Sequence, residues 1–438
     1  MKIKERPEDF QVEELTNLRP QDSGPFALYR LEKRNLNTLD ALEFVRRRWK
    51  IDRQRISFGG LKDRHALTVQ YFTIYHGPER HLKQTGLRVE YFGRASEPFS
   101  SQHTRANRFH ITVRDVGEEE IRYADQALEE VRRNGLPNYF DQQRFGSTSG
   151  GEFMARHLVL GQFEEALRLA LTAPYEFDRG PEKKEKAMLL AHWGDWKKCV
   201  NQSPERKRRV HPSPERKQRG THRPDSQILP ALEHLLHNPT DFHGALRYID
   251  PELRHLYLNA YQSYLWNRIL VRWLQLHLHA DQLFTPRLRL SAAPLSRKRV
   301  DELVFYNNLT DLQRAELLSL RLPLPTARAK LDPTDPRLNV IEDVLKDESL
   351  QHRDLKVRGL REWFFSKGER PAMCLPEGLK WETASDEWHS GKQKMVLSFD
   401  LPRGSYATLV IARITPLDAA LLKHQEKVSV HFQERFPG

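Results

Sequence analysis

One carboxylate lies between two cations in the segment Gly59-Gly60-Leu61-Lys62-Asp63-Arg64-His65-Ala66. The residues at 55–58 and 67–75 predict a short strand before this segment and a longer strand after it, so Asp63 is expected on a tight turn between two strands. We expect Lys62 and Arg64 to keep its carboxylate ionised, with a pKa below the reference value of about 3.9. A carboxylate that is anionic at neutral pH can act as a nucleophile or a base, but not as a general acid.

A Lys-Asp-Arg triplet is also common on solvated surface turns, where its charges do no chemistry. Three further segments favour the catalytic interpretation. One is an Asn between two arginines at the start of a predicted strand, and another presents Tyr406 on a turn that contains a glycine. They are Arg105-Ala106-Asn107-Arg108-Phe109, residues 135–146 and Leu401-Pro402-Arg403-Gly404-Ser405-Tyr406-Ala407-Thr408.

Residues 135–146 are rich in aromatic and amide side chains. The amides of Asn138, Gln142 and Gln143 offer paired donors and acceptors that match the edge of a nucleobase. The rings of the segment could stack on bases, or they could pack the loop into the protein core, where aromatic residues are usually found. Both interpretations stay open, with the core favoured. These rings are Tyr139, Phe140 and Phe145.

The composition describes a polar protein with an excess of positive charge. The chain has 438 residues, a net charge of +12, 38% hydrophobic and 30% charged residues. Its length predicts two domains, and the charge predicts a polyanionic partner, most often a nucleic acid. No apolar run approaches the ~20 residues of a membrane helix, and residues 1–7 lack the apolar core of a signal peptide. Two distant cysteines, Cys199 and Cys374, favour a reducing compartment, hence the cytoplasm, and argue against a zinc site.

Residues 1–149 predict an α+β domain. Strands are expected at 10–15, 26–31, 89–92 and 109–113. One helix is expected to be capped by Asn37 or Thr38 and to run through Trp49, with Leu39, Leu42, Val45 and Trp49 on its apolar face, and another from 118 to 133. Residues 150–372 are expected to be mostly helical, with helices at 162–171 and 256–278; Leu276 is expected on the apolar stripe of the second. Residues 200–226 are basic, rich in proline and poor in large apolar side chains, which predicts a flexible arm. That arm could grip phosphates or be a tolerated insertion.

The sheet pattern returns after residue 372, with strands expected at 394–401 and 409–412. A β-rich beginning, a helical middle and a β-rich end predict a catalytic domain formed by 1–149 plus 373–438, into which residues 150–372 are inserted. The predicted fold class is therefore α+β.

Six segments in this order resemble the motifs of TruD-type pseudouridine synthases. The resemblance covers nearly the whole chain, and six weak motifs in sequence are together highly specific. The arm at 200–226 is not part of the pattern, and Ala106 stands where a glycine is expected. The segments are Arg6-Pro7-Glu8-Asp9-Phe10, residues 60–66, Asn107-Arg108-Phe109, residues 137–146, residues 260–267 and residues 401–408.

The resemblance implies a mixed-sheet catalytic domain with a helical, family-specific insertion, and an enzyme that isomerises uridine, in bacteria uridine 13 of tRNA, without cofactor or metal. It implies that Asp63 is the catalytic aspartate, that Phe10 and Asn138 contact the region of the target base, and that Tyr406 packs against the flipped uracil. A phenylalanine is expected where Tyr406 stands, so its hydroxyl departs from purely apolar packing. Lys62 and Arg64 are expected to bind substrate, the partner is RNA, most often tRNA, and no obligate protein partner is implied.

Two other function classes are compatible with parts of the sequence. A nucleotidyltransferase would use Lys62 as a nucleophile, but the Lys-x-Asp-Gly arrangement of such enzymes is not present. A non-catalytic RNA-binding or RNA-folding factor would not need Asp63. The sequence has no Gly-x-Ser-x-Gly, His-Glu-x-x-His or P-loop motif that would favour a hydrolase.

Overall fold

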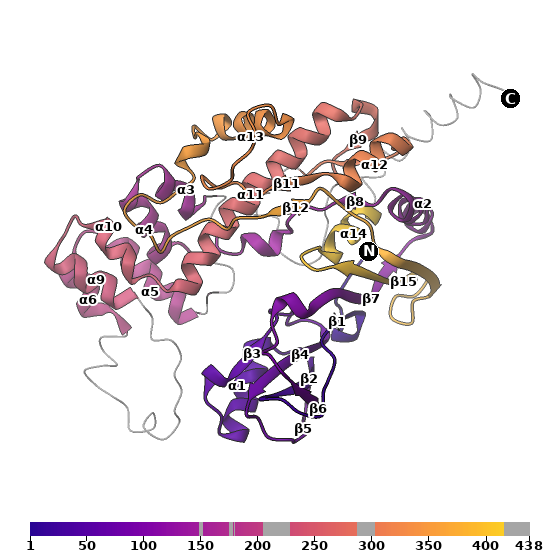
Figure 1. The fold of residues 1–438 in the computed structure, drawn as a ribbon, viewed down its shortest axis with the longest axis horizontal. Helices are drawn as coiled ribbons and strands as arrows, with labels where there is room; N and C mark the ends of the chain where they lie inside the picture. Colours follow the sequence, from indigo (N-terminus) through magenta and orange to yellow (C-terminus); the bar gives the residue numbers. More distant parts are fainter. Residues whose placement is uncertain (149–151, 175–177, 179, 205–227, 287–302, 416–438) are drawn as a thin grey trace.

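The computed structural model describes residues 1–148, 152–174, 178, 180–204, 228–286 and 303–415 (Figure 1). Its centre is a mixed sheet in the order β14-β15-β7-β1-β4-β2-β6-β5, with β3 paired to β4. Within it β1 and β4 run parallel, and the other pairs are antiparallel. The strands are β1 (Phe10–Thr16), β2 (Phe26–Arg34), β3 (Ile56–Phe58), β4 (Leu67–Tyr75), β5 (Leu82–Gln84), β6 (Leu87–Ala95), β7 (Thr104–Val116), β14 (Glu377–Ser385) and β15 (Gln393–Pro402).

Three helices cover this sheet. Helix α1 (Thr38–Trp49) buries Leu42 and Val45 against β2, β4 and β6. Helix α2 (Glu118–Asn134) packs beside α14 (Ala407–Ile414), and its Asp125 accepts a hydrogen bond of 2.9 Å from the Trp381 indole of β14. The α+β class predicted from the sequence is confirmed.

The middle of the chain forms mostly helices, which are grouped to one side of the sheet (Figure 1). The longest, α11, buries most residues of its central turns, whereas Leu253, Leu256 and Leu276 toward its ends are exposed. The helices are α3 (Met154–Val159), α4 (Phe163–Thr172), α5 (Gly180–Ala191), α6 (Trp196–Gln202), α9 (Ile228–His237), α10 (Phe242–Ala245), α11 (Pro251–His277), α12 (Asp311–Ser319) and α13 (Pro336–Asp347).

Short strand pairs join the helices to the sheet region. The pair β8–β13 places Pro137 opposite Met373 and Leu136 opposite Cys374, which brings both ends of the middle region together. The division into 1–149 plus 373–438 and 150–372 stays a prediction. The short strands are β8 (Leu136–Pro137), β9 (Leu283–Phe284), β10 (Phe305–Tyr306), β11 (Arg321–Pro323), β12 (Glu369–Pro371) and β13 (Met373–Cys374). The 3-10 helices are η1 (Pro7–Asp9), η2 (Arg53–Arg55), η3 (Ser101–His103), η4 (Gln142–Phe145), η5 (Leu246–Tyr248), η6 (Ala280–Gln282) and η7 (His352–Asp354).

Four predictions about secondary structure and burial are wrong. The expected strand at 409–412 is part of helix α14, because a short, continuously apolar run suits a buried helix as well as a buried strand. Leu39 and Leu276 were expected on apolar faces but are 40% and 60% exposed. The basic arm was expected from residue 200, yet Val200 is buried in α6. Residues 205–227, which hold the rest of that arm, lie outside the described residues.

No helix in the described part of the chain combines the length and the apolar character that a bilayer span requires.

Candidate active site

The turn that carries Asp63 is fixed from beneath by buried polar side chains. The backbone N–H of Lys62 donates to the Thr38 hydroxyl (3.0 Å), which donates to the Gln70 side-chain oxygen (2.9 Å). The Gln70 amide in turn donates to the carbonyl of Gly60 (3.2 Å). Thr38 and Gln70 are each at most 1% exposed, so these bonds form in a low-dielectric interior where they hold the turn strongly.

The Asp63 carboxylate is held by a lysine from the N-terminal segment. Lys4 Nζ donates to Asp63 Oδ2, and the backbone N–H of His65 donates to Oδ1 (3.0 Å). Burial alone would raise the pKa of Asp63, but the Lys4 charge, the Lys4 hydrogen bond and the His65 N–H outweigh it, so the pKa is lowered. The Asp63 side chain is 21% exposed, so it is an anion that a ligand can still approach.

A second lysine, Lys33 of β2, lies beneath the same turn. It is 1% exposed, and its Nζ donates to the carbonyls of Asp63 (2.7 Å) and Lys62 (3.4 Å). Burial lowers the pKa of Lys33 to about 8, although the nearby Asp63 charge opposes the change. Two cations, Lys4 on the carboxylate and Lys33 on the backbone, therefore surround Asp63.

The expectation that Lys62 and Arg64 hold Asp63 ionised is wrong. The Lys62 ammonium turns away to the Asn107 side-chain oxygen (2.6 Å) and to Glu14 (3.3 Å), a carboxylate that is 2% exposed. Arg64 is exposed, and no hydrogen bond or ion pair joins it to another described residue. Residues next to each other on a tight turn point in different directions, so proximity in sequence did not make these ion pairs.

Phe10 lies near Asp63, because the Lys4 ammonium contacts both side chains. Lys4 Nζ is 4.2 Å from the centroid of the Phe10 ring, a cation–π contact, while it also binds Asp63. Phe10 is buried at the start of β1 and meets the Phe109 ring of β7 edge-on, with centroids 6.2 Å apart. The sequence motif that contains Phe10 and the turn of Asp63 are thus brought together through Lys4.

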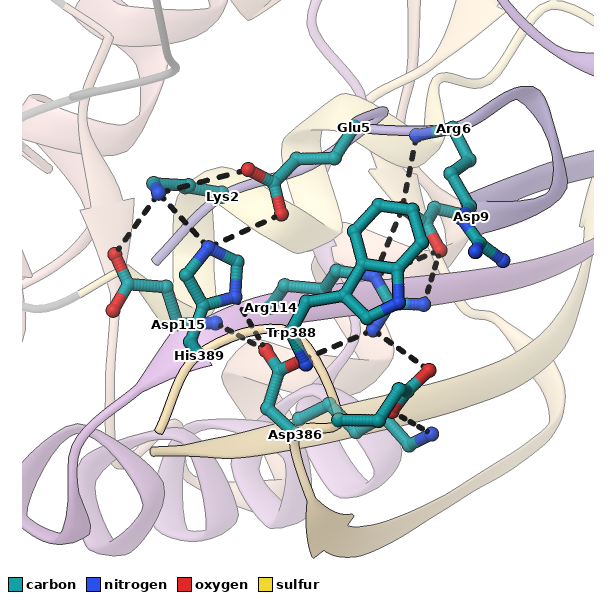
Figure 2. A network of polar contacts seen from close by, with 11 residues as sticks. Lys2, Glu5, Arg6, Asp9, Arg114, Asp115, Asp386, Trp388 and His389 are labelled. Carbon is teal, nitrogen blue, oxygen red and sulfur yellow. Dashed lines mark hydrogen bonds and ion pairs between the residues drawn. The ribbon is translucent and has the colours of Figure 1, made fainter. Parts of the chain in front are cut away.

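The position of Lys4 depends on a polar network around Arg114, shown in Figure 2. The backbone of Lys2 exchanges two hydrogen bonds with that of Arg114 (2.7 and 2.8 Å). The Arg114 guanidinium also binds Asp9 (2.9 Å) and Asp386 (3.1 Å), which lies beyond the end of β14. Residues 2–9 are therefore fastened on both sides of Lys4, which limits where its ammonium can go.

A second polar group surrounds Asn138. Its side-chain oxygen accepts from Arg370 (2.8 Å) and from the Ser405 hydroxyl (2.9 Å), and its side-chain nitrogen donates to the carbonyl of Pro371 (3.1 Å). Asn138 is 3% exposed. These bonds connect the 137–146 loop to β12 and to the turn after β15.

Tyr406 lies at the edge of this second group, at the N-terminal end of α14. Its ring centroid is 5.9 Å from the Arg370 guanidinium carbon. Burial raises the pKa of the Tyr406 hydroxyl, although Arg144 and Arg370 partly oppose this, so the hydroxyl is protonated at neutral pH and can donate a hydrogen bond.

One hydrophobic cluster connects the two groups. Phe10, Phe109 and Phe399 lie on neighbouring strands β1, β7 and β15, and Phe109 stacks on Phe399 at 5.5 Å. Leu401 at the end of β15 is opposite Asn107, the partner of Lys62. The core interpretation of the loop aromatics is confirmed, and base stacking by them is not: Tyr139, Phe140 and Phe145 are 0%, 8% and 7% exposed.

Four residues at these groups were missed in the sequence: Lys4, Glu14, Lys33 and Arg370. Each contact spans a long stretch of chain, 59 residues between Lys4 and Asp63 and 232 between Arg370 and Asn138. A signal was present for the residues of β1 and β2, because Glu14 and Lys33 are charged residues within apolar strand patterns.

One cluster in the described ranges has the residue types of a metal site. Ligand atoms of Glu152, His157 and Glu165 lie within 4.8 Å of one another. Glu165 is already paired with Arg168, and the His157 ring contacts the Gln162 side chain at 2.7 Å. Two of the three candidate ligands therefore already have protein partners.

Comparisons with known proteins agree with one another. The family model described as "tRNA pseudouridine synthase D (TruD)" matches residues 1–414. The Methanocaldococcus jannaschii protein named "Probable tRNA pseudouridine synthase D 2" is 32% identical over 419 residues, or 94% of this chain and 91% of that protein. The Aquifex aeolicus "tRNA pseudouridine synthase D" is 29% identical over 422 residues, or 94% and 98% of the two chains. A crystal structure of a Methanosarcina mazei protein assigned to TruD matches with a TM-score of 0.66 and 24% identity, and covers 95% of this chain and 93% of that one.

Proposed function

This chain belongs to the TruD family of tRNA pseudouridine synthases, and from that premise we propose that it converts uridine 13 of tRNA to pseudouridine with Asp63 as the catalytic carboxylate. The observation that carries the role of Asp63 is its ionised, reachable carboxylate on a turn that Thr38, Gln70 and Lys33 hold rigid. A preorganised anion is the group that covalent or electrostatic catalysis needs at such a site.

The reaction is an isomerisation that needs no external reagent. The bond between N1 of uracil and C1′ of ribose breaks, the base turns, and a bond forms between C5 and C1′. The proton on C5 leaves to solvent and N1 gains one, so atoms and charge balance. Asp63 can attack C1′ of the sugar or the pyrimidine ring; either route requires the carboxylate to be ionised, and Lys4 maintains that state.

We propose that the other site residues surround the target base. A uridine must leave the RNA stack to reach a carboxylate on a protein turn. We assign Phe10 and Tyr406 to its apolar walls, with the Tyr406 hydroxyl available to donate to a uracil oxygen, and Asn138 to holding the loop that faces it. Arg64, exposed on the turn, is a proposed RNA contact that can reach a phosphate. The substrate contact expected of Lys62 is not proposed, because its ammonium is paired with Glu14 and Asn107.

A nucleotidyltransferase gains no support from the site. Its nucleophile would be the amine of Lys62, which is directed to the buried Glu14 carboxylate (3.3 Å) and to the Asn107 side-chain oxygen (2.6 Å) and not toward a bound nucleotide. A non-catalytic RNA-binding role does not follow from membership of an enzyme family, and it leaves the pairing of Lys4 with Asp63 without a purpose.

We further propose that the enzyme acts in the cytoplasm, that its substrate is RNA, and that it needs no obligate protein partner. Both cysteines, Cys199 and Cys374, are free and buried, which suits a reducing compartment. The sheet region formed by 1–149 plus 373–438 would then be the catalytic domain, and 150–372 an inserted domain that extends the surface available to tRNA.

The test is release of tritium from tRNA transcripts labelled at C5 of uridine, followed by mapping of the modified position. We expect release from a transcript with uridine 13, and none above background when that nucleotide is cytidine and other uridines are unchanged. Release from the cytidine transcript would reject uridine 13 as the sole target, and absence of release from total unmodified tRNA would reject the proposed activity.

A further inference from the structure

Arg370 is a buried cation without a carboxylate partner in the described part of the chain. It is 8% exposed, and the groups that bind it are neutral: the carbonyls of Asn138 (2.7 Å) and Tyr139 (3.2 Å) and the side-chain oxygen of Asn138 (2.8 Å). Its guanidinium also lies against the Phe140 ring at 4.2 Å. Burial lowers the pKa of Arg370 to about 10, because no carboxylate opposes the loss of water. The group remains charged at neutral pH.

Arg114 shows one way in which this protein stabilises a buried arginine, by pairing it with carboxylates. It is 5% exposed and binds Asp9, Asp386 and Glu387, each within 3.1 Å (Figure 2). The hydrogen bond to Asp9 raises the pKa of its guanidinium above the usual value despite burial. A buried charge is costly unless it is paired, so an unpaired one points to a partner that arrives from outside.

The free face of Arg370 points to the turn after β15. Nε and Nη2 make all three of these hydrogen bonds to Asn138 and Tyr139, which leaves the two N–H groups of Nη1 without a partner among the described residues. A Cβ built on Gly404 would lie 3.3 Å from Nη1, so the glycine leaves this approach open. The centroid of the Tyr406 ring is 5.9 Å from the guanidinium carbon.

Nearby groups reinforce an anion-binding character. Arg144, an exposed arginine, lies 5.6 Å from the same Phe140 ring and lowers the pKa of Arg370 further by repulsion. The hydroxyl of Thr408, in the first turn of α14, is buried and has no hydrogen-bond partner among the described residues. The backbone of a first helical turn also presents free N–H groups. Two cations and a helix start thus lie near Tyr406, and the described acid that acts on that ring, the buried Asp141, makes no ion pair with Arg370.

We propose that Arg370 binds, through Nη1, a backbone phosphate of the RNA next to the target nucleotide. The phosphate then supplies the negative charge that the site lacks. The proposal rests on the proposed function, because it places the nucleotide at Tyr406. An anionic oxygen satisfies both the charge and the fork of donors. A uracil oxygen would satisfy the donors but leave the charge uncompensated, which is why the phosphate is favoured.

The experiment measures dissociation constants of the full-length protein with tRNA whose modified uridine has first been mapped. Each phosphate flanking that uridine is replaced in turn by a neutral methylphosphonate. For the contacted phosphate we expect wild type to lose about 30-fold in affinity, and Arg370→Gln to lose no more than twofold on the same replacement. Because the RNA is chosen from the mapped position, failure at uridine 13 or at Asp63 does not affect this result.

Two controls keep the test decisive. Arg30→Gln removes a guanidinium that is already paired with Glu90 (3.1 Å) and should retain the full 30-fold loss. If Arg370→Gln unfolds, the proposal is tested with Arg370→Lys and wild type. A wild type that loses less than threefold in affinity at every flanking phosphate overturns it. Equal losses in wild type and Arg370→Gln also overturn it.

A further substrate separates phosphate from base. An RNA that is abasic at the target position keeps its phosphates but has no uracil oxygens. We expect the methylphosphonate to weaken wild-type binding to this RNA as strongly as to the normal one. If Arg370→Gln weakens binding to the normal RNA but not to the abasic RNA, the contact is to uracil and the phosphate assignment is wrong.

Discussion

The ammonium of Lys62 lies 3.3 Å from the carboxylate of Glu14, although Lys62 directly precedes Asp63 in the chain. Glu14 is buried on β1, where it also accepts from the backbone N–H of Tyr71 (3.0 Å) and the hydroxyl of Thr104 (2.8 Å). Lys62 is therefore an anchor that fastens the turn to the sheet. The cation on Asp63 comes instead from Lys4, which leaves each carboxylate with one lysine.

Replacement of Lys62 by methionine is expected to destabilise the fold. It leaves the Glu14 carboxylate buried without its cation, which typically costs about 3–5 kcal/mol. The measurement is the free energy of unfolding in urea. Lys62→Met combined with Glu14→Gln should recover part of that loss, because no buried charge remains. If the double variant is as unstable as the sum of both single variants, the ion pair does not have the assigned role.

Asp63→Asn should abolish pseudouridine formation while RNA affinity stays within about threefold of wild type. The amide has nearly the same shape but no charge, so it cannot act as a nucleophile or stabilise a developing cation. Tritium release and a filter-binding assay on the same tRNA give the two quantities. Asp332→Asn, a change at an exposed acid bonded to Thr334, is the matched control and should be fully active. Activity in Asp63→Asn above a hundredth of the wild-type rate would contradict the assignment.

Lys4→Met should move the acid limb of the activity profile to higher pH. In wild type the pKa of Asp63 is lowered, so the carboxylate is ionised from pH 5 upward. Without Lys4, burial dominates and raises the pKa, so the active, ionised fraction falls as the pH drops toward 5. The ratio of kcat/KM at pH 5 and pH 8 tests this, and Lys4→Arg should restore the wild-type ratio. Unchanged ratios in Lys4→Met would show that Lys4 does not control the ionisation.

The strands and helices around Asp63 were predictable, because they follow from local patterns. The strand predicted at 67–75 is β4, and the helix predicted to follow a cap at Asn37 or Thr38 and to run through Trp49 is α1, which Asn37 precedes as its N-cap. Alternation and capping act over a few residues, so they can be read without knowing the rest of the fold. The lowered pKa of Asp63 was also predicted correctly in direction, since a carboxylate among cations is expected to be ionised.

The partners of Asp63 were not predictable, because they depend on tertiary contacts. Lys4 reaches Asp63 only because Arg114 and Asp386, far along the chain, fasten residues 2–9 to the sheet. Helix α14 was mistaken for a strand for a related reason. An apolar run of four residues is compatible with both structures, and burial on all sides decides between them. Arg370 had no local signal, since its partner Asn138 is 232 residues away.

The affinity for tRNA should fall steeply with salt. The net charge of +12 and cations such as Arg64 and Arg370 imply contacts with several phosphates, and each one releases counterions. A plot of log affinity against log salt concentration between 50 and 300 mM should be linear, with a slope of about −4 or steeper. Arg64→Gln should make the slope shallower by about one. A dissociation constant that does not depend on salt would contradict a phosphate-binding surface.

Lys33 gives the last prediction, because its burial links stability to alkaline pH. The pKa of Lys33 is about 8 in the folded protein, against 10.5 for an ordinary lysine. Between these values the unfolded chain binds more protons at this position than the folded one, so the stability contributed by Lys33 rises with pH. Lys33→Met removes the titration.

The free energy of unfolding of wild type relative to Lys33→Met should therefore increase between pH 8 and pH 10, by at most about 1.4 kcal/mol per pH unit. Chemical unfolding of both proteins at several pH values gives this difference directly, and other titrating groups cancel in the comparison. A difference that stays constant over this range would mean that Lys33 keeps an ordinary pKa and that its ammonium, beneath the Asp63 turn, is not desolvated.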